Sequence, residues 1–304
     1  MKTLMAALAF CLLTTIAHSQ NPKPYTDFSG GIHTGYKDST GKIVIQPKYE
    51  MGLYFSHGYA SVKLNGKWGY INTKGEEVIA LQYDKAMDFS EGLAAVNIGG
   101  ADNDHGFFSG GKWGYIDTTG KVVIEITLDN AGVFSEGIAK ANKGGTHNAN
   151  GYFSSGWGYI DKTGKPITDF KYQSAGNFSD GVAVVQLNDK YGLIDRTGKE
   201  LTAMKYNVIN SCKEGMADMM IGDKCGYIDS TGKEVIAPKY QYAYSFREGL
   251  ACVQLGGKYG FIDKTGAVVI PFKYTDAGSF MNGVTSVELA GKRFKIDKKG
   301  NPVK

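Results

Sequence analysis

Short apolar runs separated by polar turns recur along the chain after its first twenty residues. In one stretch, Val182–Leu187 is apolar and β-branched, and residues 188–189 are a polar turn. Residues 191–194 then have the pattern of a second strand, with side chains that alternate between its two faces. A turn at residues 195–198 and a third run at residues 199–203 follow. Runs of this length between Gly- and Asp-containing turns are typical of hairpins. Each stretch therefore predicts a three-stranded antiparallel meander.

The meander belongs to a tandem repeat of 34 residues. The Gly that ends an Asp-x-Thr-Gly turn stands at positions 41, 75, 120, 164, 198, 232, 266 and 300, and the Gly of Phe-Ser-Glu-Gly keeps the same spacing from 58 to 283. We therefore predict one β domain over residues 20–304 with eight copies, of which the first and last are degenerate. Two neighbouring copies carry insertions, at about 98–111 and 143–156.

The expected fold is all-β, with the three-stranded meanders stacked in an open, solenoid-like array. A closed β-propeller is the alternative. Three strands per unit is fewer than the usual four of a propeller blade, and degenerate end copies are what the caps of an open array look like. Both points favour the open form.

A Trp-Gly pair opens the second strand of three copies, at Trp68-Gly69, Trp113-Gly114 and Trp157-Gly158. Side chains alternate along a strand, so Trp and the following Tyr point to one face, and Gly and Ile to the other. We interpret both as structural. Trp supplies a large apolar surface, and Gly leaves room for a bulky group of the neighbouring unit, such as an aromatic ring.

With these motifs the chain resembles the bacterial WG-repeat family, also called KWG repeats. The resemblance spans about residues 28–304 and is carried by "GKWGYID" at 111–117 and by "PKY" at 47–49 and 238–240. It implies an all-β repeat protein, often exported and usually without a defined biochemical activity. The family supplies no catalytic residues.

The first nineteen residues have the pattern of a secretory signal peptide. Lys2 precedes an apolar run over residues 4–17, which is shorter than the about 20 residues that span a bilayer, and Ala17 and Ser19 suit a signal peptidase. We predict cleavage after Ser19 and a periplasmic, cell-surface or secreted location. No other long apolar segment follows, so we expect no transmembrane segment in the mature chain.

Charge and polar motifs point away from nucleic acid and catalysis. The net charge of +4 gives no basic footprint for nucleic acid. A series of equivalent turn carboxylates is expected to cap turns rather than act as an acid–base pair: Asp38, Asp117, Asp161, Asp195, Asp229, Asp263 and Asp297. The acidic residue before the second marker Gly has the same interpretation. We predict no enzyme, cofactor or metal, since neither the His spacing nor "DND" at 102–104 completes a metal site.

Three cysteines would remain after cleavage: Cys212, Cys225 and Cys252. They stand at positions where other copies have Phe, Trp or Tyr, and small strand residues. We expect them to replace apolar core residues; a Cys225–Cys252 disulfide or a reactive thiol is the alternative.

The two insertions depart most from the repeat. Both read Gly-Gly, a polar stretch, then Gly-aromatic-Phe-Ser, and both lie in the hairpin between the first and second strands. A harmless loop extension is one reading. Aromatics among Gly, Ser and Asn also suit an adaptable binding surface, and the candidate residues are Asp102, His105, Phe107, Phe108, His147, Asn148, Tyr152 and Phe153. The expected function is an exported binding or scaffold protein with a protein or glycan partner. A purely structural envelope protein is the alternative, and a glycan-active enzyme is less favoured.

Overall fold

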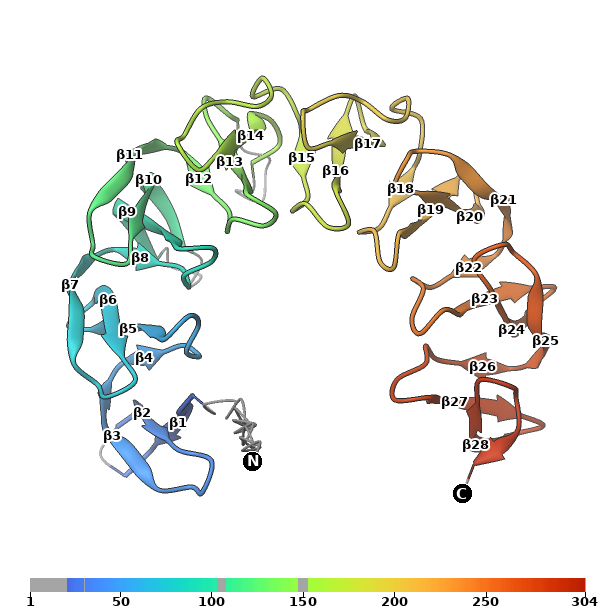
Figure 1. Cartoon of the computed structure of the whole chain (residues 1–304), viewed down its shortest axis with the longest axis horizontal. Helices are drawn as coiled ribbons and strands as arrows, with labels where there is room; N and C mark the ends of the chain where they lie inside the picture. The colour runs from blue at the N-terminus through green and yellow to red at the C-terminus, as the bar shows by residue number, and fades with distance from the viewer. Residues whose placement is uncertain (1–20, 30, 103–107, 147–152, 304) are drawn as a thin grey trace, which may run out of the picture. The chain divides into compact units, whose positions relative to one another are not determined.

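The computed structural model describes residues 21–29, 31–102, 108–146 and 153–303, and all regular structure in these ranges is β-sheet (Figure 1). These residues fall into two compact units, one up to Leu81 and the other from Gln82 onward. The sheets are small and antiparallel, and none of those described is closed into a barrel. The predicted all-β fold of tandem antiparallel sheets is confirmed.

The first unit contains two sheets. The strands are β1 (Lys23–Asp27), β2 (His33–Lys37) and β3 (Ile43–Tyr49), and then β4 (Met51–Gly52), β5 (Tyr59–Leu64), β6 (Lys67–Asn72) and β7 (Glu77–Tyr83), whose last two residues already count with the second unit. Strands that follow one another in sequence are neighbours in each sheet.

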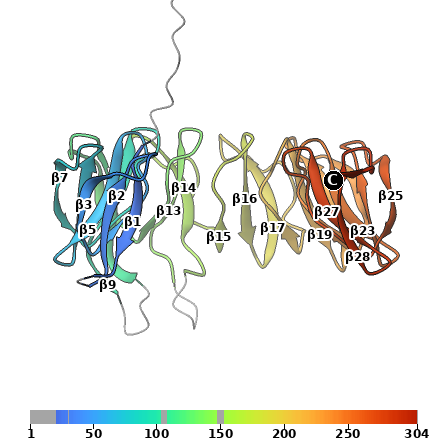
Figure 2. The same ribbon diagram turned by 90° about the horizontal axis from the view of Figure 1, so that it is seen from below.

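The second unit repeats this arrangement in six sheets. Their strands are β8 (Lys85–Ala86), β9 (Leu93–Asp102), β10 (Phe108–Asp117) and β11 (Val122–Leu128); β12 (Asn130–Ala131), β13 (Ile138–Asn142) and β14 (Trp157–Asp161); β15 (Ser174–Ala175), β16 (Val182–Leu187) and β17 (Lys190–Asp195); β18 (Val208–Ile209), β19 (Met216–Ile221), β20 (Lys224–Asp229) and β21 (Glu234–Tyr240); β22 (Tyr242–Ala243), β23 (Ala251–Leu255), β24 (Lys258–Ile262) and β25 (Val268–Tyr274); and β26 (Asp276–Ala277), β27 (Val284–Leu289), β28 (Lys292–Asp297) and β29 (Pro302–Val303). In Figure 2 the strands of this unit stand upright, and the far end of β9 lies at the lower edge.

The number of strands per repeat differs from the prediction. Five of the eight sheets in the described ranges have four strands. The strand that the sequence did not predict has two residues, as in β18, which pairs with β19 through Val208↔Met220 and Ile209↔Met219. Two residues are too few to produce an alternating pattern, so this segment looked like a connection. The predicted antiparallel repeat is confirmed, and its predicted number of three strands is corrected to four in these five sheets.

The last strand of the repeat, which we call the outer strand, is broken in two consecutive sheets, β12–β14 and β15–β17. Only isolated bridges remain there. Where β11 has Ile124, these two copies have Thr168 and Thr202. The Oγ1 of Thr168 accepts the backbone N–H of Tyr159 at 3.1 Å, and the Oγ1 of Thr202 accepts that of Leu193 at 2.9 Å. A hydroxyl that takes a ladder hydrogen bond competes with the backbone carbonyl, and regular pairing is lost.

Each hydrophobic core lies between two successive sheets. Tyr115 of β10 packs with Phe134, Ala139 of β13 and Ile160 of β14, and all four are buried. The Tyr115 and Phe134 rings meet edge to face with centroids 4.9 Å apart, and the Tyr115 hydroxyl donates to the Gly132 carbonyl at 2.7 Å. Such a ring pair contributes about 0.5–1.5 kcal/mol beyond its buried area. A repeat therefore depends on its neighbour for its core.

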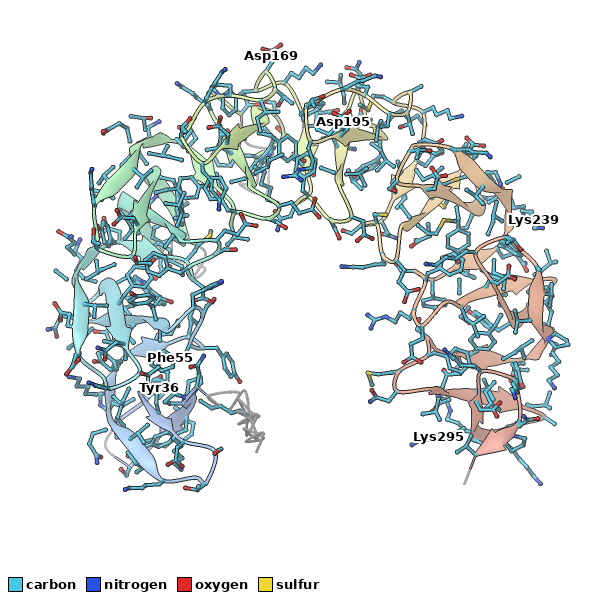
Figure 3. All side chains as sticks on the ribbon, in the orientation of Figure 1. Tyr36, Phe55, Asp169, Asp195, Lys239 and Lys295 are labelled. Atoms are coloured by element: carbon cyan, nitrogen blue, oxygen red, sulfur yellow. The ribbon has the colours of Figure 1, made fainter. Side chains whose placement is uncertain are left out.

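The same ring pair recurs in both units. Tyr159 packs on Phe178 at 5.0 Å and Tyr227 on Phe246 at 4.9 Å. In the first unit Tyr36 and Phe55, from successive sheets, lie 5.0 Å apart (Figure 3). The Tyr that follows Trp-Gly and the Phe of Phe-Ser-Glu-Gly are thus one inter-repeat contact, which explains why both recur with one period.

The Gly of the Trp-Gly pair is required for a reason that the sequence analysis got wrong. A Cβ on Gly114 would lie 2.5 Å from the carbonyl oxygen of Ile124 and 2.8 Å from the Cα of Ile126, both in β11 of the same sheet. The register between β10 and β11 shifts at this point. The atoms nearest to Gly114 therefore belong to a bulged outer strand of the same sheet and not to a ring of a neighbouring unit.

Candidate functional site

The turn aspartates cap their own turns, as predicted. The Oδ1 of Asp117 accepts the Thr119 hydroxyl at 2.6 Å and the backbone N–H groups of Thr119 and Lys121 at 2.9 and 3.1 Å. The hydrogen bond from Thr119 is the main cause that lowers the pKa of Asp117. The same bonds occur at Asp161 and Asp195. These carboxylates are equivalent and engaged, so they provide no pair in contrasting environments for acid–base chemistry.

The second series of carboxylates joins each sheet to the next one, which the sequence analysis did not foresee. Glu91 has a φ of 51°, and its Oε2 accepts the N–H of Gly137, in the next sheet, at 2.9 Å. Burial alone would raise the pKa of Glu91, but hydrogen bonds from Lys162 and Gly137 outweigh it and lower that pKa. The same bond links Glu136 to Gly181 (3.0 Å), Asp180 to Gly215 (2.9 Å), Glu214 to Gly249 (3.0 Å) and Glu248 to Gly283 (2.9 Å). These groups serve the scaffold.

Corresponding contacts form the base of both insertions. The Nδ2 of Asn97 donates to the Gly110 carbonyl at 3.2 Å, and that of Asn142 donates to the Ser155 carbonyl at 2.7 Å. Both asparagines are fully buried. An aspartate that directly precedes the short first strand of each sheet accepts a backbone N–H from the insertion. Asp84 accepts that of Gly99 at 2.7 Å, and Asp129 accepts that of Gly144 at 2.6 Å.

The base of each insertion also uses a close pair of glycines and a Phe–Trp contact. A Cβ on Gly111 would lie 2.3 Å from the nitrogen of Gly100, and one on Gly156 would lie 2.4 Å from the Cα of Gly145. The rings of Phe108 and Trp113 meet edge to face at 6.0 Å, and those of Phe153 and Trp157 do so at 6.1 Å. We call this base of each insertion the stalk, and the same stalk occurs in the hairpins of two consecutive sheets.

The structure places three of the eight candidate binding residues. Phe108 and Phe153 are half-buried against Trp113 and Trp157, and Asp102 is exposed at the end of β9. The other five lie outside the described residues: His105, Phe107, His147, Asn148 and Tyr152. Phe108 and Phe153 therefore support the stalks, and the binding role of the loops stays a prediction.

The three cysteines are free thiols, of which Cys212 and Cys252 are buried, as expected from their repeat positions, and Cys225 is half-buried. Cys212 and Cys252 are buried in inter-sheet cores, and Cys225 packs against a third core. Burial raises the pKa of Cys212 to about 11 and that of Cys252 to about 12. A thiol with a raised pKa is a weak nucleophile near neutral pH, which agrees with a packing role.

A polar pocket of about 320 Å³ opens where the outer strand is broken. It lies between the outer segment that follows β14 and the turn that follows β17, and Asp169 stands at this edge of the second unit (Figure 3). It is lined by Pro166, Ile167, Thr168, Asp169, Lys171, Tyr172 and Gly198. The sequence signal for this pocket is Thr168 and Thr202, which stand where five other copies have Ile.

Tyr172 is the unusual residue of this pocket. Its side chain is fully buried, and its hydroxyl has no hydrogen-bond partner among the described residues. Burial raises the pKa of Tyr172, and the carboxylates of Glu200 and Asp169 raise it further. The phenol is therefore neutral near pH 7 and able to donate a hydrogen bond. Lys171 lies 3.8 Å from Glu200, a weak ion pair at an exposed edge.

Comparison with protein families gives seven matches to one repeat. The family described as "WG containing repeat" matches residues 35–68, 68–100, 113–146, 157–191, 191–225, 226–259 and 259–292. The chain belongs to the WG-repeat family. In this WG-repeat chain each match begins in the strand that carries Trp-Gly or its equivalent. No curated protein matches the chain.

Several solved structures are similar to this WG-repeat chain at low identity. A crystal structure of a eukaryotic initiation factor is 12% identical with a TM-score of 0.54, over 93% of this chain and 83% of that one. Apo AztD from Citrobacter koseri is 12% identical with a TM-score of 0.39, over 94% and 92%. Kluyveromyces lactis Hsv2 is 8% identical with a TM-score of 0.39, over 76% and 86%. These neighbours are propeller-like, and the first match supports the fold alone.

Membrane-spanning helices and metal-binding clusters are both absent from the described ranges. No helix there is long and apolar enough to cross a membrane. No group of three or more His, Cys, Asp or Glu side chains is arranged there to hold a metal ion.

Proposed function

We propose that this chain is an exported, non-catalytic repeat protein that binds a protein or glycan partner through its two inserted loops. The WG-repeat membership supports a repeat-type binding protein. The repeat itself spends its recurring polar groups on its own turns and on joining neighbouring sheets. Recognition then falls to the places where the chain departs from the repeat, and loops on a rigid scaffold are where binding residues are usually found.

The observation that carries the proposal is the duplicated stalk. A harmless extension needs no defined base, whereas here a buried Asn, a close glycine pair and a Phe–Trp contact occur twice. Such a base reduces the conformational freedom that a loop loses when it binds a partner, and this favours affinity. Because the two hairpins belong to consecutive sheets, we propose that one partner contacts both loops.

A pull-down from cell-envelope extract tests the loops. Replacing residues 98–112 and residues 143–156 each with the short turn at residues 187–190 restores the 34-residue period. We expect this variant to melt at the same or a higher temperature, since the inter-sheet cores are intact, and to lose the partner. The matched control puts the same turn in place of residues 221–224, in a hairpin without an insertion, and keeps the partner. If the partner stays bound after both loops are removed, the loops are not the site.

Export is tested by the mass of the protein recovered outside the cytoplasm. We expect residues 1–19 to be absent and Gln20 to be the first residue. A full-length mass in that fraction would overturn the assignment of a signal peptide. A purely structural envelope role predicts instead that no specific partner is recovered with the intact chain.

A further inference from the structure

The pocket beside Tyr172 is a second departure from the repeat, and it does not depend on the inserted loops. The next repeat contains the same three residue types in the same places, so it shows what a closed version looks like. There the Tyr206 hydroxyl donates to Glu234 Oε1 at 2.9 Å, and Lys205 Nζ lies 2.7 Å from the same oxygen. Tyr, Lys and Glu satisfy one another at that site.

The three equivalent residues at the pocket do not bond to one another in this way. Glu200 remains 3.8 Å from Lys171 and makes no hydrogen bond with Tyr172. A buried polar group without a partner is costly to the folded state. The contrast between Tyr172 and Tyr206 is therefore best explained if the Tyr172 hydroxyl is kept for a group that is not part of the chain.

We propose that this pocket binds one saccharide unit or a similar small polyhydroxyl compound. The volume of about 320 Å³ lies at the lower end of the roughly 300–1,000 Å³ of small-molecule sites. That size suits a single small ring, and the open mouth allows a longer chain to continue into solvent.

The chemistry of the lining favours hydroxyl groups over ions. The pocket offers a neutral phenol at Tyr172, a carboxylate at Asp169 and an ammonium at Lys171. A ligand hydroxyl both donates and accepts, so it can serve all three. An anion would meet Asp169 and the nearby Glu200, whereas a cation would meet Lys171. Pro166 and Ile167 give the apolar surface against which the C–H face of a sugar ring can pack.

The breaks in the outer strand explain how the chain makes this room. In the regular repeats the third outer-strand residue is an Ile that packs against the turn glycine of the next sheet, as Ile124 does near Gly164. At the pocket Thr168 takes that place, its hydroxyl is bonded to Tyr159, and Gly198 approaches its Cγ2 closely. The shorter side chain and the irregular backbone leave room beside Tyr172, which lines the pocket although its side chain is buried.

The test uses the full chain and four neutral sugars: glucose, galactose, mannose and N-acetylglucosamine, titrated by calorimetry and by saturation-transfer NMR. We expect saturable binding of at least one sugar. Tyr172→Phe should weaken it about 10-fold, as expected for the loss of one buried hydrogen bond. The matched variant Tyr206→Phe should leave the affinity unchanged. No saturable binding of any of these sugars, or equal affinity in Tyr172→Phe, would overturn the proposal.

Melting temperatures give an independent readout. Tyr172→Phe removes an unpartnered hydroxyl, so the Tm of the sugar-free protein should stay or rise. Tyr206→Phe breaks the bond to Glu234 and should lower it. A lower Tm in Tyr172→Phe would mean that the hydroxyl has a structural partner, which would remove the basis of the proposal. The loop-shortened protein should still bind the sugar, so this inference and the loop proposal fail separately.

Discussion

The close approach of the outer strand to the Trp-Gly glycine predicts a large effect for the smallest substitution, Gly226→Ala. A Cβ at this position would lie 2.4 Å from the carbonyl oxygen of Ile236, 2.8 Å from the nitrogen of Pro238 and 2.9 Å from the carbonyl carbon of Ala237. All three atoms belong to the backbone of β21, which is paired on both sides of the bulge. Relief of these close contacts therefore requires that β21 move away from β20.

The chain contains its own matched control at Gly192. There a Cβ would lie 2.5 Å from the Sδ of Met204 and 3.1 Å from the Oγ1 of Thr202, both in side chains. The outer strand of that sheet is broken, and none of the three atoms nearest to that Cβ belongs to the backbone. An unbranched Met can change rotamer at small cost. Neither Gly192 nor Gly226 has a positive φ, so left-handed strain contributes to neither substitution.

The expected magnitudes follow from these contacts. Overpacking typically costs about 1–3 kcal/mol, and we expect Gly226→Ala to lie near the upper end because backbone must yield. Gly192→Ala should cost less than about 1 kcal/mol. Ala lowers the entropy of the unfolded chain equally in both, by about 0.4–1 kcal/mol, so that contribution cancels in the comparison.

Urea melts followed by circular dichroism measure the difference as a shift in midpoint at constant m-value. Equal losses, or a larger loss for Gly192→Ala, would mean that β21 yields easily. The close backbone approach would then not be the reason for Gly in the motif.

Three further predictions concern the scaffold. Gly114→Val should destabilise more than Trp113→Phe in the same melts, because Val meets the backbone of β11 whereas Phe retains most of the ring contact; the reverse order would contradict this. The folded-state pKa values of Asp117, Asp161 and Asp195 are lowered from 3.8, so the stability that these carboxylates supply is complete above that pH and is lost as the pH falls through the lowered values. The Tm should therefore stay constant above about pH 5 and drop below about pH 4. A Tm that does not change down to about pH 2 would refute this prediction. Small-angle scattering tests the open array, which requires an extended particle, against a closed propeller, which requires a compact disc.

The repeat could be predicted because its signals are local. An Asp that caps its own turn and the Gly that follows it lie within four residues of each other. The spacing of these turns along the chain therefore reveals the period and the hairpins. The burial of Tyr115 also follows from the strand pattern. Its partner Phe134 belongs to the next repeat, and the sequence showed only that both residues recur together.

Features that depend on register could not be predicted in this way. The reason for Gly114 is a bulge in the neighbouring strand, and a bulge leaves no mark in an apolar pattern. Glu91 resembles a turn-capping residue until the distance to Gly137 of the next sheet is known. The two-residue strand β18 is too short to be recognised. It also removes the argument that three strands per unit disfavour a propeller, since four is the usual content of a blade.

The sheet of β12, β13 and β14 carries both departures from the repeat, and Trp157 stands between them. Its ring packs against Phe153 at the base of the second insertion, while its backbone N–H and carbonyl pair with those of Tyr172 at 3.0 and 2.9 Å. A loop replacement that also altered Trp157 would disturb the pocket, and a failed sugar titration would then have two explanations. The replaced segment therefore has to end at Gly156, which leaves Trp157 and its pairing with Tyr172 in place. Under that design, loss of the partner reports on the loop and loss of the sugar reports on the pocket.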